Sequence, residues 1–75
     1  MKVTYDAEAD AIYIELRSLA PGTAQCRELS EGLCADYGPD GKLAGIEILD
    51  ASVVLGSDLD RVVLEVAPAL STRST

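Results

Sequence analysis

Apolar and polar residues alternate along residues 11–16 with the period of two that is typical of a half-buried β-strand. Ile12, Ile14 and Leu16 share one face of this expected strand, whereas Tyr13 stands on the opposite face. Because the tyrosine ring is largely apolar, we expect the second face of the strand to be partly covered as well.

A second alternating stretch, residues 42–49, predicts another strand, and its inward positions are Ala44, Ile46 and Ile48. Gly45 interrupts this stretch, and a glycine inside a strand indicates a bulge or a close backbone contact. The two stretches together supply aliphatic side chains for a core.

Shorter or more polar segments predict three further strands, over residues 2–5, 23–30 and 33–37. The strongest turn signal of the chain, Gly38-Pro39-Asp40-Gly41, follows the last of them. Pro39 presets one backbone angle of the turn, and Gly41 is free to adopt the left-handed conformation. We therefore expect a hairpin between the strand at 33–37 and the strand at 42–49.

The C-terminal third predicts one short helix, residues 50–55, which Asp50 would cap and Gly56 would end. Residues 58–66 fit two patterns. The helical pattern uses Leu59, Val62, Val63 and Val66, and the strand pattern uses Val62, Leu64 and Val66. We favour the strand because the segment is rich in β-branched residues and because Pro68 limits a helix.

These elements predict a fold of the α+β class that is mostly β. We expect an antiparallel sheet of five or six strands in hairpins, with one short helix near residues 50–55. Residues 1–66 form a single small domain on this interpretation, and residues 67–75 form a tail that frays.

The amino-acid composition limits how much apolar surface the core of this fold can bury. The chain has 75 residues with no Phe and no Trp, and its aromatic residues are three tyrosines, Tyr5, Tyr13 and Tyr37. So small a domain without Phe or Trp often needs a staple or a partner. We therefore expect a homodimer that buries the apolar surface left over by a single sheet. The alternative is a monomer in which the C-terminal segment covers the sheet.

The formal net charge of -7 excludes several classes of partner. Nucleic acids and anionic membranes attract clustered Lys and Arg, and the six basic residues here are scattered. A basic protein is the partner that this charge favours. The N-terminal residues show no secretory signal, so we expect the protein in the cytoplasm with its cysteines reduced.

Two segments of the chain carry a resemblance to a known family. Residues 1–16, MKVTYDAEADAIYIEL, and residues 40–52, DGKLAGIEILDAS, are similar to the two signatures of DUF2283, a small bacterial family of unknown function. Ala7 departs from the family pattern, where Pro is common. The resemblance covers about residues 1–55 and implies no reaction or cofactor. Some members lie beside toxin-like genes, so the resemblance implies an antitoxin-like role for part of the family.

The candidate metal site is an acidic cluster near the N-terminus. Asp6, Glu8 and Asp10 have the spacing that opens a calcium-binding loop, but Ala11 and Arg17 stand where the loop needs Gly and Glu. The chain has no His, which removes the commonest metal ligand and general base. We expect a solvated turn and no specific metal.

Four other carboxylates, those of Asp36, Asp40, Glu47 and Asp50, would converge if the strands at 33–37 and 42–49 pair through the Pro39-Asp40-Gly41 turn. Two carboxylates in a cleft can perform acid–base catalysis. The simpler interpretation gives each a local role, in which Asp40 holds a turn, Asp50 caps the helix, and Asp36 and Glu47 face water.

The remaining candidates are thiols, tyrosines and glycines. Cys26 and Cys34 lie on adjacent expected strands, and without further ligands they cannot complete a zinc site. We expect them to be small buried apolar residues, and we expect the three tyrosines to be packing residues. The pair Gly38 and Gly41 is too closely spaced for a phosphate-binding loop.

The sequence therefore identifies no catalytic, cofactor-binding or metal-binding residue. The function that fits best is a non-enzymatic interaction module. The first alternative is a structural or small-ligand-binding homodimer with a pocket at the subunit interface, and the second is a carboxylate-based enzyme.

Overall fold

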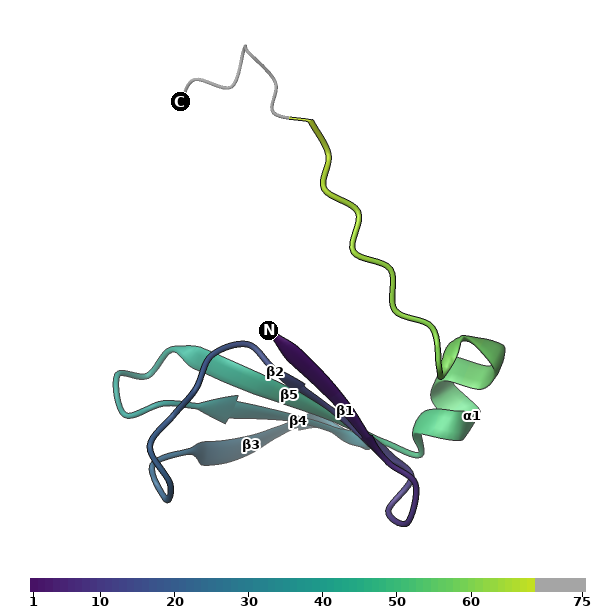
Figure 1. Ribbon diagram of the computed structural model, residues 1–75. Coiled ribbons are helices and arrows are strands. Elements are labelled where there is room, and N and C mark those ends of the chain that lie inside the picture. Colours follow the sequence, from purple (N-terminus) through teal and green to yellow (C-terminus); the bar gives the residue numbers. More distant parts are fainter. Residues whose placement is uncertain (69–75) are drawn as a thin grey trace.

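The computed structural model describes residues 1–68 and shows one antiparallel sheet followed by one short helix (Figure 1). The strands are β1 (Lys2–Asp6), β2 (Ala11–Glu15), β3 (Gln25–Ser30), β4 (Leu33–Tyr37) and β5 (Leu43–Leu49), and the helix is α1 (Ala51–Leu55). Their order across the sheet is β1-β2-β5-β4-β3. The mostly-β class, five of the expected strands and the helix near residues 50–55 are confirmed.

One connection is not a hairpin. Strands β2 and β3 follow each other in the chain, but β5 and β4 lie between them in the sheet. The connection, residues 16–24, therefore crosses the end of the β4–β5 hairpin. Arg17 anchors it there, because its Nη2 atom donates hydrogen bonds to Asp40 Oδ1 at 2.7 Å and to the carbonyl oxygen of Lys42 at 3.0 Å.

The β4–β5 hairpin follows the sequence prediction closely. Gly41 has a φ of 79°, and Asp40 holds the turn by accepting a hydrogen bond from the Lys42 amide at 3.0 Å. The expected bulge is also present. Asp36 pairs with Gly45 and the next residue of β4, Tyr37, pairs with Leu43, so the intervening Ala44 has no partner on β4.

The start of α1 corrects the prediction for Asp50. This residue precedes the helix with a φ of 52°, and its side chain makes no capping hydrogen bond. The cap comes instead from Asp10, in the turn between β1 and β2. Asp10 Oδ1 accepts the Ser52 amide at 3.0 Å, and Asp10 Oδ2 accepts the Ser52 hydroxyl at 2.6 Å. Gly56, with a φ of 56°, ends the helix as expected.

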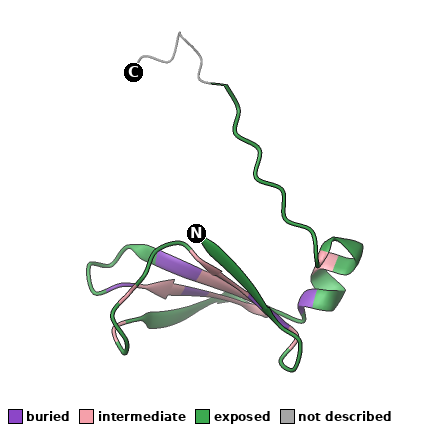
Figure 2. Cartoon of the chain, viewed as in Figure 1, coloured by how far each residue is buried: buried purple, intermediate pink, exposed green. Residues whose placement is uncertain are grey.

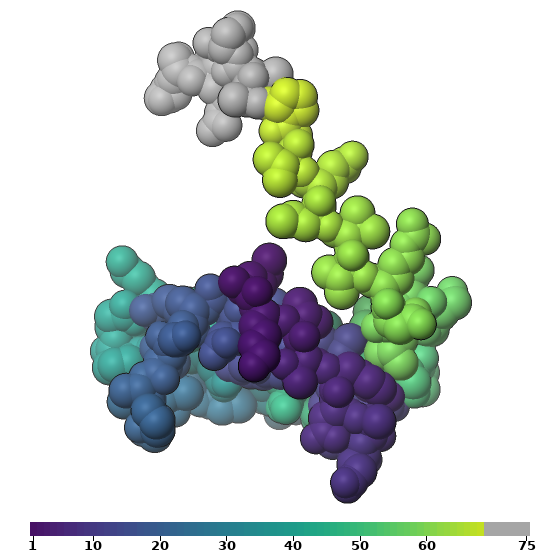
Figure 3. Space-filling model, in the orientation of Figure 1, coloured from purple at the N-terminus to yellow at the C-terminus, as the bar shows by residue number. Residues whose placement is uncertain are grey.

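The prediction of a strand over residues 58–66 is wrong for the single chain. A 3-10 turn, Gly56–Asp58, follows α1, and residues 61–68 then continue without regular structure. They extend away from the sheet in Figures 1 and 3, and all of them are exposed. A strand requires a neighbouring strand for its backbone hydrogen bonds, and this segment has none within the described residues. The predicted tail, residues 67–75, lies outside the described residues from residue 69 onward.

The buried core is small and consists mainly of alanine. Its members are Ala11, Ile12, Ala35, Ala44 and Ala51. Figure 2 shows that most of the sheet is half-buried or exposed. The radius of gyration is 15.0 Å, against about 11 Å for a compact domain of this length, because residues 61–68 extend away from the sheet. The expectation of a limited core is therefore confirmed. No helix in the part of the chain that the structure describes has the length and hydropathy to cross a membrane.

Candidate functional site

The sheet separates polar from apolar side chains onto its two faces. Side chains of successive residues point to opposite faces, and directly paired residues share a face. The pairing of the five strands therefore assigns each residue. On one side, which we call the polar face, the first row runs Thr4, Tyr13, Glu47, Cys34, Glu28 and the second runs Lys2, Glu15, Gly45, Asp36, Cys26. A shorter third row on this face runs Asp6, Ala11, Leu49.

The opposite side, which we call the apolar face, carries two rows of mainly aliphatic and aromatic residues. The first row runs Val3, Ile14, Ile46, Ala35, Arg27, and the second runs Tyr5, Ile12, Ile48, Leu33, Ser30. Val3 and Tyr5, on the edge strand β1, are exposed. Among the residues that the structure describes, no second layer of strands or helices covers this face; α1 lies only beside the end of β2 (Figure 1).

A hydrogen bond across β5 organises the polar face. The Tyr13 hydroxyl donates to Asp36 Oδ2 at 2.8 Å, although Tyr13 is on β2 and Asp36 is on β4. Gly45 lies between them, and a Cβ atom at this position would overlap the Tyr13 hydroxyl. The bond to Asp36 raises the pKa of Tyr13 to about 12, and burial of the hydroxyl adds to this shift. This finding corrects the expectation that Asp36 simply faces water.

A second polar cluster joins the β1–β2 turn to α1. Asp10 Oδ1 also accepts a hydrogen bond from the Tyr5 hydroxyl at 2.8 Å. The bonds from Ser52 and Tyr5 hold the pKa of the Asp10 carboxyl below its ordinary value. The same contact with Asp10 raises the pKa of the Tyr5 hydroxyl. The side chains of Tyr5 and Ser52 are thus both hydrogen-bonded to Asp10, and the three together stabilise the fold. Tyr5 therefore does more than pack.

The three residues of the expected calcium pattern do not act together. The Asp6 carboxylate accepts hydrogen bonds from the amides of Glu8 and Ala9, at 3.0 and 3.3 Å, and so forms the turn itself. The Asp10 carboxylate accepts hydrogen bonds from the hydroxyls of Tyr5 and Ser52. Within residues 1–68, no group of three or more His, Cys, Asp and Glu side chains is arranged to hold a metal ion.

The carboxylates considered for acid–base chemistry are dispersed. Asp40 forms an ion pair with Arg17 at 2.7 Å, and Arg17 lowers the pKa of the Asp40 carboxyl. Asp50 follows the far end of β5, about 16 Å from Gly45 at the usual rise of a strand. Asp36 and Glu47 do share the polar face, but they lie in different rows. The structure therefore does not bring the four carboxylates into one cleft.

The two cysteines lie on the paired strands β3 and β4, as expected, and both are free. Cys26 is exposed and Cys34 is half-buried, so the prediction that both are buried is wrong. Strand β3 is an edge strand, which leaves its side chains open to solvent. The neighbouring Cys34 thiol raises the pKa of Cys26, with further contributions from burial and from Asp36. A raised pKa lowers the fraction of reactive thiolate.

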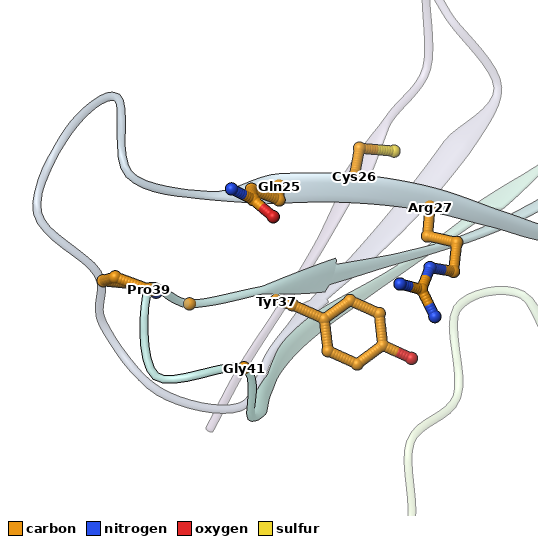
Figure 4. A pocket seen from close by; sticks show the side chains of 7 residues that line it. Gln25, Cys26, Arg27, Tyr37, Pro39 and Gly41 are labelled. Carbon is orange, nitrogen blue, oxygen red and sulfur yellow. The ribbon is translucent and has the colours of Figure 1, made fainter.

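A shallow cavity of about 270 Å³ lies where β3 begins and β4 ends, beside the β4–β5 turn (Figure 4). Its lining residues are Gln25, Cys26, Arg27, Tyr37, Gly38, Pro39 and Gly41. The Arg27 guanidinium carbon lies 5.3 Å from the centroid of the Tyr37 ring, a cation–π contact. Pockets for small ligands usually enclose about 300–1,000 Å³. This cavity lies within one chain, so it does not support the alternative of a ligand pocket between subunits.

Sequence reasoning missed both hydrogen-bonded clusters. Tyr13 and Asp36 are 23 residues apart, and Asp10 and Ser52 are 42 residues apart. Gly45 was the available signal for the first cluster, because a glycine in a strand indicates close approach by another group. No sequence pattern connects Asp10 with Ser52.

Comparison with known protein families gives a match. The family model described as a protein of unknown function, DUF2283, matches residues 2–52. The matched region contains all five strands and the first two residues of α1. The resemblance inferred from residues 1–16 and 40–52 is thereby confirmed. Neither a curated protein nor a solved structure matches the chain.

Proposed function

Because the chain belongs to the DUF2283 family, whose description assigns no activity, we propose its function from the geometry of the sheet: it is a non-enzymatic interaction module that binds a basic protein partner on the polar face. The observation that carries this proposal is the separation of charged and apolar residues onto opposite faces of one open sheet. An open sheet face presents a broad surface for contact with another protein.

The charges of the polar face favour a basic partner. Five carboxylates, those of Asp6, Glu15, Glu28, Asp36 and Glu47, share this face with one basic side chain, Lys2. Lys2 is paired directly with Glu15, which leaves four carboxylates without a paired cation. The net charge of the whole chain, -7, has the same sign. Such a surface attracts cationic proteins over long range and repels anionic ones.

The geometry also favours binding over catalysis. The side chain with the largest pKa shift, Tyr13, is engaged in a hydrogen bond with Asp36. A general acid or base needs an available proton position that a substrate can reach. A small basic toxin would be a suitable partner, and in that case the module would have an antitoxin-like role.

The test is co-purification of the tagged full chain from its source cell at low salt. We expect a small basic protein to be recovered and then released as the ionic strength rises, because surface charges are screened by salt. The informative variant is Glu28→Lys/Glu47→Lys, which reverses two charges on the polar face. We expect it to lose the partner.

The matched control is Asp58→Lys/Asp60→Lys, which changes the net charge equally beyond α1, at two exposed positions. We expect the control to retain the partner. Equal loss in both variants would mean that only net charge matters and would contradict a polar-face site. Recovery of no basic protein would contradict the proposed function.

A further inference from the structure

Two apolar surfaces have no partner among the residues that the structure describes. The first is the apolar face of the sheet, where Val3 and Tyr5 are exposed. The second is the segment of residues 61–66, which we call the C-terminal segment. Val62, Leu64 and Val66 in this segment are 70%, 76% and 80% exposed. Water disfavours both surfaces, so each stabilises the protein when it is covered.

The C-terminal segment has the pattern of a half-buried strand. Val62, Leu64 and Val66 occupy alternate positions, Val63 and Glu65 lie between them, and Arg61 precedes them. An extended chain therefore presents one wholly aliphatic side. The segment is about 20 Å long when extended, and five paired strands span about 19 Å, so it can lie across the whole apolar face.

The path of the chain directs the segment away from its own sheet. The chain leaves α1 through the turn at Gly56–Asp58, and residues 61–68 then extend away from the sheet with every residue exposed (Figures 1 and 3). The large radius of gyration reflects this extension. Residues 1–68 of the same chain therefore leave its apolar face open.

Charge distribution favours a second copy of this chain as the occupant of the apolar face. The polar faces of two copies repel each other, because both carry the carboxylates of Glu28, Asp36 and Glu47. The two rows of the apolar face contain one charged residue, Arg27, at the β3 edge. Contact between copies through the apolar face thus avoids most like-charge pairs.

We propose that the protein forms a symmetric dimer in which the C-terminal segment of each copy packs on the apolar face of the other. Val62, Leu64 and Val66 of one copy contact the two apolar rows of its partner, beginning at the exposed Val3 and Tyr5. The exchange is reciprocal, so one two-fold contact covers all four apolar surfaces. This dimer leaves both polar faces free and is therefore independent of the basic partner proposed above.

The test combines light scattering with nuclear magnetic resonance on the full chain. We expect a mass of about twice the 7.9 kDa of one chain at micromolar concentration. In a mixture of isotope-labelled and unlabelled protein, filtered nuclear Overhauser spectra should connect Val62 and Leu64 methyl groups of one copy with Tyr5 and Val3 of the other. A mass of one chain that persists as concentration rises would overturn the proposal, as would contacts found only within one copy.

Variants separate the segment from other exposed aliphatic residues. Leu64→Asp should lower the measured mass from two chains to one. The substitution places a charge on the apolar side of the segment and so destabilises the dimer contact. The matched control is Val53→Asp on α1, where the side chain is 81% exposed and lies outside both surfaces. We expect the control to remain a dimer. A Leu64→Asp variant that keeps the dimer mass would show that the C-terminal segment is not the contact.

Discussion

Tyr13 on β2 and Asp36 on β4 are joined by a 2.8 Å hydrogen bond that passes over the strand between them, because Gly45 on that strand has no side chain. The bond links three adjacent strands on the polar face of the sheet. It therefore fixes the relative positions of β2, β5 and β4 in a protein whose buried core is mostly alanine.

Substituting Gly45 with Ala should destabilise the fold by about 1–3 kcal/mol, the usual cost of overpacking a well-filled site. The added Cβ overlaps the Tyr13 hydroxyl and must displace the ring. Urea unfolding of the two proteins measures this difference. The control is the same substitution in a Tyr13→Ala background, where the clash is absent and the cost should be smaller. An equal cost in both backgrounds would contradict the interpretation that Gly45 leaves room for the Tyr13 ring.

Tyr13 should ionise near pH 12, which a titration of tyrosinate absorbance can measure. The folded-state pKa is raised above the ordinary value of 10.0, so the bond stabilises the fold fully below pH 10.0. That stabilisation is lost as pH rises through about 12. Tyr13→Phe should remove this transition, and Asp36→Asn should move it to lower pH. If Tyr13 ionised at the same pH in Asp36→Asn, the hydrogen bond to Asp36 would not be the cause of its raised pKa.

Asp10 should make stability sensitive to acid. Its folded-state pKa lies below the ordinary value of 3.8, so its contribution is present above pH 3.8 and is lost as pH falls through the folded-state pKa. Asp10→Asn removes the charge but tolerates the positive φ of this position. We expect the variant to unfold at a lower temperature at neutral pH, with the difference narrowing in acid.

The control for this experiment is Asp50→Asn. Asp50 has nearly the same positive φ, yet its side chain makes no capping hydrogen bond to α1. Its melting temperature should match that of the parent protein. If Asp50→Asn were the more destabilising of the two substitutions, the assignment of the helix cap to Asp10 would be wrong.

Gly41→Val should destabilise the protein by about 1 kcal/mol or more, because a β-branched residue is strained at positive φ. The position has a φ of 79° and open space around it, so backbone strain rather than a clash determines the cost. Gly41→Asn should cost less, since Asn adopts this conformation more readily. Thermal melts compare the three proteins. A Gly41→Val variant that melts like the parent would contradict the importance of this turn.

The sequence predicted those parts of the fold that depend on local pattern. Alternation placed the strand with Ile12 and Ile14, and the glycine of the Asp40-Gly41 turn marked the hairpin that the structure contains. These signals concern neighbouring residues, where periodicity and backbone preferences act directly.

The remaining features depend on contacts between distant segments. The crossover at residues 16–24 places β2 beside β5, and only that order lets Tyr13 reach Asp36. Asp50 fitted the pattern of a cap, but the β1–β2 turn supplies Asp10 in its place. The β-branched residues of the C-terminal segment indicated a strand, yet a strand also needs a neighbour, which sequence composition does not specify.

We propose that the polar face of the sheet binds a basic protein. Chemical-shift mapping of the isotope-labelled full chain, titrated with the protein recovered at low salt, locates the binding surface. We predict saturable shifts at the amides of Glu15, Glu28, Asp36 and Glu47, which weaken as ionic strength rises. Shifts confined to the apolar face or the C-terminal segment, or no saturable shifts at all, would contradict the claim.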